Sequence, residues 1–335
     1  MPAAPIDIHA HYYPEELIAL WREEGPRCGG GVGEVEGKGP VLKAGGIQTN
    51  PLGPLFYDLD ARLAAMDGQG VAVHAMSLSL PMVYWADKAL AQKLSECYND
   101  AIATAHLRHP DRLVGLAMLP MHFPAAALAE LGRARTLPGV RGVYMATAMA
   151  GRELSDATFF PVYEAIEAAG LPIFLHPNGV IGHERLAAHY LHNLLGNPFE
   201  TAIAAAHLVF GGVLDRFPRL TFCLPHAGGA FPYLVGRLQR GFEKRPELAG
   251  RKLGPLDYLR RFYYDTISYH GPALDYLKGL AGADRLLMGS DYCFPIALER
   301  PVETVTGHAG FTAAEQALIV EGNARRLLGL GGGGS

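Results

Sequence analysis

The sequence predicts an α/β fold, a (β/α)8 or TIM barrel with a lid-like insertion after its first strand. Short apolar runs alternate along the chain with longer helical patterns, which is typical of βαβ units and a parallel sheet. Eight such runs can be counted, and 335 residues are enough for one large barrel. The length alone would also fit two average domains, so the prediction depends on the strand count.

The expected elements follow one another in a regular order. Strands are expected at residues 6–9, 71–77, 113–118, 140–145, 171–176, 220–224, 262–265 and 286–288. Helices are expected at 87–109, 125–137, 159–169, 199–209, 230–240 and 272–280. Residues 1–330 are therefore expected to form a single barrel domain. Residues 331–335 read GGGGS, which is typical of a flexible linker or a cloning scar.

Two segments interrupt this order. Residues 12–57 contain GPRCGGGVGEVEGKGP and NPLGPLF, a composition too rich in Gly and Pro for regular elements and a length too great for an ordinary loop. We expect this segment to cover the mouth of the barrel as a lid. Residues 178–197 follow the fifth strand, carry several histidines and are expected to form another part of the rim.

The composition excludes several classes of partner. The chain has 29 Lys and Arg against 33 Asp and Glu, a formal charge of −4, so nothing favours nucleic acid or an anionic membrane. No apolar run reaches the roughly 18 residues of a membrane span, and the first residues do not resemble a signal peptide. The four cysteines are far apart and form no CxxC pair. A cytoplasmic protein in a reducing compartment is therefore expected.

Histidines and one aspartate follow four of the expected strands. The first strand ends in DIHAH, and because alternate strand residues face the same side, His9 and His11 can point to one centre. His176 closes the fifth strand, His226 follows the sixth and Asp291 follows the eighth. Each could instead be a hydrogen-bonded core residue, or in the case of Asp291 a helix cap. Their joint position at the mouth where barrel enzymes build their sites favours metal binding.

The segments around these residues resemble the amidohydrolase superfamily. They are DIHAHYYP at 7–14, FLHPNG at 174–179, NPFETAIAAAHLVFGGVLDRFPRL at 197–220, LPHAGGAFPYLVGRL at 224–238 and LMGSDYCFP at 287–295. The sequence is most similar to the branch that contains 2-amino-3-carboxymuconate 6-semialdehyde decarboxylase and related aromatic-acid decarboxylases. The resemblance runs from near the N-terminus to about residue 328.

This resemblance implies a metal site and a role for each residue in it. The residues that match His9, His11, His176 and Asp291 bind one divalent metal in the family, usually zinc, with a water in the remaining position. The match to His226 is not a ligand but acts on that water as general acid/base, so the catalytic residues are expected to be His226 and Asp291. Imidazoles and a carboxylate suit zinc, with manganese as an alternative.

The same resemblance predicts a single metal rather than two. Two-metal members bridge their ions with a carboxylated lysine at the end of the fourth strand, where this chain reads VRGVYM. There is no lysine between Lys93 and Lys244.

The resemblance also points to residues that would contact substrate. Arg237 matches an arginine that, in the related decarboxylase, reaches the neighbouring subunit's site and holds a carboxylate, which implies a homodimer; it could also be a surface arginine. Asn178 replaces a tryptophan of that enzyme, and residues 29–61 offer only Lys38 and Lys43 where it has arginines. Aromatic residues near the mouth could wall a pocket or be ordinary packing. The residues expected to contact substrate are Arg237, Asn178, Trp85 and Tyr292.

Three functions remain in competition. The first is a metal-dependent non-oxidative decarboxylase, a carboxy-lyase that acts on a small aromatic or dienoic carboxylic acid. The second is a metal-dependent hydrolase that uses the same site to cleave a C–N, C–O or C–C bond. The third is a barrel kept as a binding or scaffold protein, against which the presence of all the expected site residues speaks.

Overall fold

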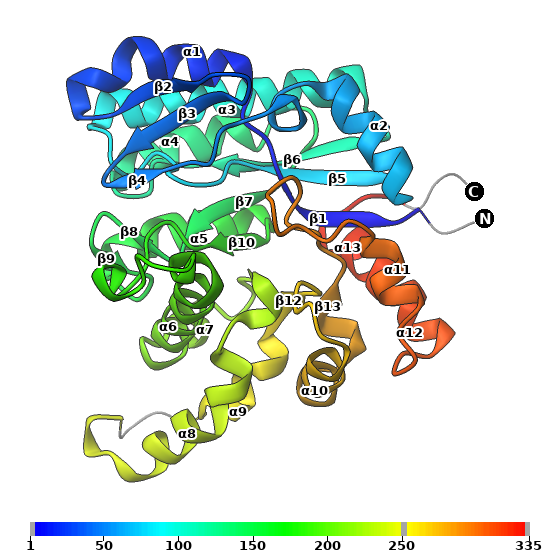
Figure 1. Cartoon of the computed structure of the whole chain (residues 1–335). Coiled ribbons are helices and arrows are strands. Elements are labelled where there is room, and N and C mark those ends of the chain that lie inside the picture. The colour runs from blue at the N-terminus through cyan, green and yellow to red at the C-terminus, as the bar shows by residue number, and fades with distance from the viewer. Residues whose placement is uncertain (1–3, 249–252, 332–335) are drawn as a thin grey trace.

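The predicted barrel is confirmed. The computed structural model describes residues 4–248 and 253–331, and eight parallel strands form one sheet in the order β1-β5-β6-β7-β10-β11-β12-β13 (Figure 1). Strands that lie side by side in the barrel also follow one another along the chain. This order is expected for right-handed βαβ crossovers. Residues 332–335 of the expected tail lie outside the described residues.

Each expected strand and each expected helix has formed within a few residues of its predicted position. The strands of the barrel are β1 (Ile6–His11), β5 (Val73–Ser77), β6 (Leu113–Met118), β7 (Val140–Ala146), β10 (Ile173–His176), β11 (Phe222–Leu224), β12 (Phe262–Asp265) and β13 (Leu286–Leu287). The helices that follow them are α2 (Leu59–Gln69), α3 (Lys88–Arg108), α4 (Pro124–Ala134), α5 (Phe160–Ala169), α6 (Asn197–Phe210), α7 (Val213–Arg216), α8 (Phe231–Lys244), α9 (Pro255–Tyr258), α10 (Gly271–Ala281), α11 (Pro301–Thr306), α12 (Ala313–Ala317) and α13 (Asn323–Leu327).

The barrel is closed where its first and last strands meet. The Ile8 N–H donates to the Met288 carbonyl at 3.1 Å, and the Asp291 N–H donates to the His9 carbonyl at 3.0 Å. The His11 N–H donates to the carbonyl of Tyr292 at 2.6 Å. These bonds fix the loop that carries Asp291 against the strand that carries the two histidines.

The insertion contradicts the expectation that it lacks regular structure. It forms a helix, α1 (Glu15–Glu24), and a three-stranded antiparallel sheet of β2 (Gly31–Val35), β3 (Gly39–Ala44) and β4 (Ile47–Gln48). The glycines serve the turns between these strands, since Gly37, Gly45 and Gly46 all have positive φ. Figure 1 shows α1 and this sheet against α3 and α4, to one side of the barrel strands.

The helix of the insertion is held by an apolar face that the high glycine content hides. Leu17, Ile18 and Trp21 recur at helical spacing and are buried. The Trp21 ring packs on Trp85, in the loop after β5, with 4.8 Å between ring centroids. The insertion is therefore attached to the barrel by a hydrophobic contact.

Residues 178–197 lie at the carboxyl end of β10, as expected. They contain a short 3-10 turn (His183–Arg185) and a π-helical turn (His192–Gly196) that runs directly into α6. Among the described residues, no helix is both long enough and apolar enough to cross a membrane.

The Asn99 side chain is expected to be a major polar contribution to stability. It is fully buried on α3, where it donates to the Met118 carbonyl and the Glu130 carboxylate and accepts from the Met118 N–H. Asn99→Ala leaves these partners unsatisfied, and we expect the free energy of unfolding to fall by about 2–4 kcal/mol. Urea denaturation of the variant measures this loss. Thr104→Ala, on the exposed side of the same helix, serves as the control and should change stability by less than about 0.5 kcal/mol.

Candidate metal centre

Four buried side chains converge at the carboxyl end of the barrel. His9, His11, His176 and Asp291 each place one potential ligand atom within 4.8 Å of the others. The two Nε2 atoms of His9 and His11 are 3.2 Å apart, and Asp291 Oδ1 lies 3.1 Å from His11 Nε2. Three imidazoles and one carboxylate at these separations fit a single divalent metal ion. The structure thus brings together all four residues that the sequence singled out as ligands.

The outward nitrogen of each histidine has a partner that fixes the ring. His9 Nδ1 is 2.8 Å from Asp265 Oδ2, and His176 Nδ1 is 2.7 Å from the Pro177 carbonyl oxygen. Because both oxygens only accept, these rings carry their proton on Nδ1 and leave Nε2 with a free lone pair for a metal. His11 Nδ1 lies 3.2 Å from the Ser77 hydroxyl.

Burial and mutual proximity keep two of the ligands neutral. Burial, followed by the neighbouring imidazoles, holds the pKa values of His11 and His176 well below their usual range. Burial would also lower the pKa of His9, but its hydrogen bond to Asp265 and the charge of Asp291 raise that pKa. Burial raises the pKa of Asp291. A cation at the centre would favour the ionised carboxylate and the neutral rings.

His226 lies beside the ligands without being one of the converging four. Its ring centroid is 5.3 Å from that of His9 and 5.5 Å from that of His176. Among the described residues, its buried Nδ1 has no hydrogen-bond partner. Burial lowers the pKa of this imidazole. His226 is therefore a neutral ring with one nitrogen available to receive a proton.

The backbone is strained where it delivers His226 and Asp291 to the site. His226, Ala227 and Asp291 have φ values of 53°, 55° and 64°, in the left-handed region that non-glycine residues rarely adopt. Strain of this kind costs about 1–3 kcal/mol per residue and is found mainly at functional sites.

Asp265, which was not predicted as a site residue, supports both His9 and the strained turn. Besides His9, its carboxylate accepts the backbone N–H groups of His226 at 2.9 Å, Ala227 at 2.7 Å and Ile267 at 3.0 Å. Burial alone would raise the pKa of Asp265, but its bond with His9 and the donors around it lower that pKa. The signal was present, because Asp265 closes the seventh strand as His176 closes the fifth.

The metal centre opens into a cavity of about 270 Å³. His176, His226 and Asp291 line it, and carboxamides and aromatic rings make much of the remaining wall. The other polar or aromatic lining residues are Gln48, Asn50, Asn178, His183, Tyr190, His192, Asn193, Asn197 and Phe294. Among the described residues, no lysine or arginine lines this cavity.

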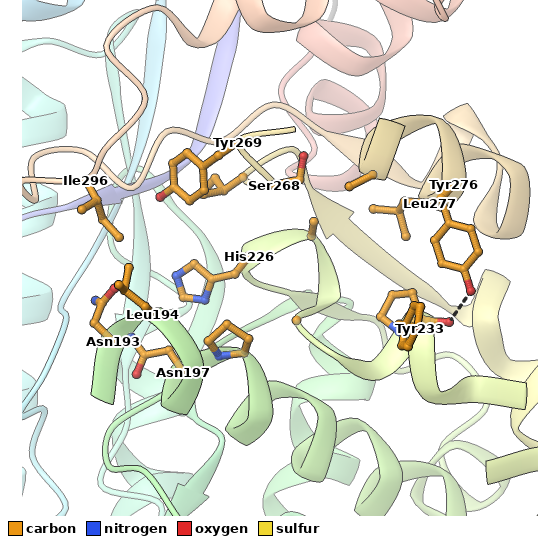
Figure 2. Close-up of a pocket in the computed structure, with 16 residues that line it drawn as sticks. Asn193, Leu194, Asn197, His226, Tyr233, Ser268, Tyr269, Tyr276, Leu277 and Ile296 are labelled. Atoms are coloured by element: carbon orange, nitrogen blue, oxygen red, sulfur yellow. Dashed lines mark hydrogen bonds between the residues drawn. The ribbon is translucent and has the colours of Figure 1, made fainter. Parts of the chain in front are cut away.

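A second chamber of about 380 Å³ lies on the other side of His226. It shares His226, Asn193 and Asn197 with the first chamber. Figure 2 shows the His226 ring between these two asparagines and Tyr269, with Tyr233 and Tyr276 farther from it. His226 thus lies where the two chambers meet.

The four residues expected to contact substrate lie in different places. Asn178 lines the cavity of the metal centre. Trp85 lines a separate cavity that adjoins it, and packs on Trp21. Arg237 is exposed on α8 and lines neither chamber of its own chain. The remaining aromatic, Tyr292, is buried outside the cavity.

Tyr292 is held in that position by a buried arginine that the sequence analysis missed. Arg62 has 0% of its surface exposed, and its guanidinium lies over the rings of Tyr12 and Tyr292 at 5.4 and 4.8 Å. It also donates to the carbonyl oxygen of His11. Phe294, two residues after Tyr292, instead faces the cavity and contacts the His11 ring at 5.1 Å between centroids. No local pattern indicates which of these two aromatic side chains turns inward.

Asp265→Asn is expected to weaken metal binding by about 10–100-fold, which is typical for the loss of an outer partner of a ligating histidine. The amide would replace one carboxylate oxygen with an NH2 group, which cannot accept the two hydrogen bonds that this oxygen now accepts. Titration of the metal-free variant with zinc, followed calorimetrically, measures the change. Asp284→Asn, on the surface, is the matched control. An unchanged affinity would contradict a role for Asp265 in holding His9.

This chain is similar to known proteins over most of its length. The family model described as Amidohydrolase matches residues 6–330. The 2-amino-3-carboxymuconate-6-semialdehyde decarboxylase of Dictyostelium discoideum is 32% identical over 278 residues, which cover 82% of this chain and 77% of that protein. The gamma-resorcylate decarboxylase of Rhizobium radiobacter is 28% identical over 295 residues, with 82% and 88% covered.

Solved structures have the same fold over nearly the whole chain. The IDCase of Metarhizium anisopliae superposes with a TM-score of 0.87 at 27% identity and covers 98% of this chain and 97% of its own. A dihydroxybenzoic acid decarboxylase of Polaromonas, with bound manganese, superposes with a TM-score of 0.80 at 23% identity and covers 98% and 97%. The predicted resemblance is confirmed, and the chain belongs to the amidohydrolase family.

Proposed function

We propose that this protein is a metal-dependent, non-oxidative decarboxylase of a small aromatic or dienoic carboxylic acid. The observation that carries the proposal is the buried group of three histidines and Asp291, with His226 beside it, in the wall of one cavity. Decarboxylases of such acids among the relatives support this reaction over hydrolysis.

A divalent metal bound by the four ligands would act as a Lewis acid that binds oxygen atoms of the substrate and stabilises developing negative charge. The residues of the chain supply the rest. Asp265 and the carbonyl of Pro177 orient the ligating rings, and Phe294 offers an aromatic edge to a flat substrate. His226 carries the proton in two steps. The neutral ring first takes a proton from water or from a hydroxyl group of the substrate, and the imidazolium then gives that proton to the carbon as its bond to the carboxylate breaks and CO2 leaves.

We propose zinc as the native metal, since three imidazoles and one carboxylate form a donor set that zinc prefers. Manganese is the alternative, and the bound manganese in the Polaromonas structure keeps that alternative open. Elemental analysis of protein purified without chelators, followed by reloading of metal-free protein with either ion, distinguishes them.

The decisive experiment incubates the metal-loaded protein with aromatic and dienoic acids and measures CO2 release. Salicylate, resorcylates and unsaturated dicarboxylates cover the acids of interest. Release of CO2 that chelation abolishes and metal restores would support the proposal. Hydrolysis of esters, lactones or amides without CO2 release would instead favour the hydrolase. Protein that holds less than about 0.2 metal ions per chain and stays inactive after reloading would favour a non-enzymatic role.

We also propose that residues 1–330 work as one domain in a homodimer, in which Arg237 of one subunit serves the site of the other. The absence of lysine and arginine from the described lining of the cavity leaves the substrate carboxylate without a cationic side chain of its own subunit. The exposed position of Arg237 on α8 leaves it free to reach a partner.

The unpaired cysteines fit a reducing, cytoplasmic location.

A mixing experiment tests this shared site. Arg237→Ala and His226→Ala are each expected to be inactive, because each dimer lacks one essential group in both sites. Mixed dimers contain one site with neither change, so a re-equilibrated equal mixture should recover about a quarter of the wild-type rate. If Arg237→Ala alone keeps full activity, or the mixture stays inactive, Arg237 does not act across the interface.

We propose that residues 45–50, the turn after β3 together with β4 and the residues that follow it, act as the lid. Gly46, Ile47, Gln48 and Asn50 line the cavity of the metal centre, so closure of this segment would shield a bound substrate from water. Hydrogen exchange of residues 45–50 should slow on binding of a carboxylate inhibitor. Unchanged exchange would argue for a fixed wall.

A further inference from the structure

A third cavity, of about 300 Å³, adjoins the metal-centre cavity. The two cavities share Ile47, Asn178 and Gly179 in their walls. None of the metal ligands and no other residue that we place in the chemistry lines this third cavity. It therefore lies beside the reaction centre, on the far side of Asn178.

The wall that the two cavities share includes a glycine that its backbone conformation does not require. A Cβ atom built on Gly179 would meet nothing within 4 Å, and the backbone there has no positive φ that would explain the glycine. Asn178 lines both cavities, and its buried Oδ1 has no hydrogen-bond partner among the described residues. A ligand group that crosses this point could satisfy that oxygen.

The walls of the third cavity are suited to an uncharged, flat group. Tyr84 and Trp85 provide aromatic surface, and the small side chains of Ala148 and Ala150 also line this cavity. Within the described part of the chain, neither this cavity nor the metal-centre cavity is lined by lysine or arginine. An anionic group would thus be desolvated without a counter-charge.

Glu200 adds a polar end to this cavity. One of its carboxylate oxygens accepts the N–H of Ile181 at 2.5 Å, and the side chain is partly buried in the cavity wall. A carboxylate only accepts hydrogen bonds, so it favours a hydroxyl or amino group and repels a second carboxylate.

We propose that this third cavity is a substrate subsite that takes an uncharged aromatic arm, tipped with a hydrogen-bond donor, of the acid held at the metal centre. The proposal rests on the proposed function and narrows its substrate class to monocarboxylic acids with two rings or an equally long neutral substituent. At about 270 and 300 Å³, each cavity alone is at or below the lower end of the roughly 300–1,000 Å³ of small-molecule sites, whereas the two together fit such an acid.

Binding measurements on the metal-loaded protein test the subsite without requiring turnover. The probes are 2-hydroxybenzoate, its 4-phenyl and 5-phenyl derivatives, and the same derivatives with a carboxylate on the outer ring. At least one phenyl derivative should bind ten times more tightly than 2-hydroxybenzoate or better, and the added carboxylate should remove that gain. If neither phenyl derivative binds more tightly than the parent acid, the subsite does not exist.

Trp85 gives a direct optical readout. The chain has two tryptophans, and Trp21 is fully buried whereas Trp85 lines the third cavity. The phenyl derivative should quench tryptophan fluorescence, and Trp85→Phe should remove most of that quenching. Quenching that survives in Trp85→Phe would place the arm elsewhere.

A cavity-filling variant with a matched control completes the test. Ala148→Phe should remove the gain from the phenyl arm and leave the Kd of 2-hydroxybenzoate within about twofold. Ala129→Phe, on the exposed face of α4, should leave both values unchanged. Equal weakening of both acids by Ala148→Phe would contradict a subsite. The wild-type probe series decides the question if Ala148→Phe does not fold.

Failure of this inference can be told apart from failure of the proposed function. Release of CO2 from single-ring acids with no gain from the arm would remove the subsite and leave the decarboxylase. Tight binding of the arm without CO2 release from any acid would leave the subsite and remove the decarboxylase.

Discussion

Replacing His226 with alanine is expected to lower kcat for CO2 release by about 10³-fold while the protein keeps most of its metal. General acid/base catalysis by a positioned side chain contributes about 10²–10⁴-fold. The His226 ring lies 5.3 Å from that of His9, and its buried Nδ1 has no hydrogen-bond partner among the described residues. His226 is not among the four converging ligands, so its loss removes no donor from the centre. Metal content and the rate of CO2 release, measured on the same preparation, check both parts.

His226→Asn separates the loss of the proton carrier from a change in the backbone. Asparagine tolerates the φ of 53° found at this position better than most residues, but it cannot exchange a proton at neutral pH. Both variants should therefore be inactive and metal-bound. A loss of metal from both would make His226 a ligand and overturn the division of roles.

The pH dependence of the wild-type enzyme follows from the same residue. Burial lowers the pKa of His226 from its usual value of 6.5, and a cation at the centre would lower it further. A group with a lowered pKa stays neutral to more acidic pH, so the acid limb of kcat should lie below pH 6.5. That limb should be absent from the residual rate of His226→Asn.

The strands and the ligands could be predicted from the sequence because they obey short-range rules. A buried parallel strand is a short apolar run, and its last residue reaches the mouth of the barrel whatever the loops do. His176 and Asp291 were found in this way. Asp265 obeys the same rule, but its role depends on the turn of residues 226–227 that it holds, which comes from another strand.

The residues that could not be predicted depend on contacts between distant segments. Trp85 turns toward Trp21, because the insertion brings a helix over it. Tyr292 turns away from the cavity, because Arg62 on α2 lies over its ring. The insertion was wrongly expected to be irregular, since its glycines mask the apolar face of α1. In each case the outcome depends on packing that no local pattern contains.

Removal of the Asp291 carboxylate is expected to have the largest effect on the metal. Asp291 Oδ1 lies 3.1 Å from His11 Nε2 and 3.5 Å from His9 Nε2, and it is the single anionic donor among the four converging groups. Asp291→Ala leaves three neutral imidazoles in a buried site. The metal Kd should then rise by more than the roughly 10–100-fold expected for an outer partner, and CO2 release should be lost with the metal.

Two comparisons show whether charge or shape causes this loss. Asp291→Asn keeps the φ of 64° accessible and preserves the N–H that donates to the His9 carbonyl, so the loop should stay in place while the charge is removed. Asp275→Asn, an exposed carboxylate paired with His308, should change neither the metal content nor the rate.

Because burial raises the pKa of Asp291, protons compete with the metal for this oxygen, and wild-type metal affinity should fall as the pH falls. That dependence should be weaker in Asp291→Asn, since the amide has no proton to lose. If Asp291→Ala or Asp291→Asn bound metal as tightly as the wild type, the three histidines would suffice as ligands, and Asp291 would act only in the reaction.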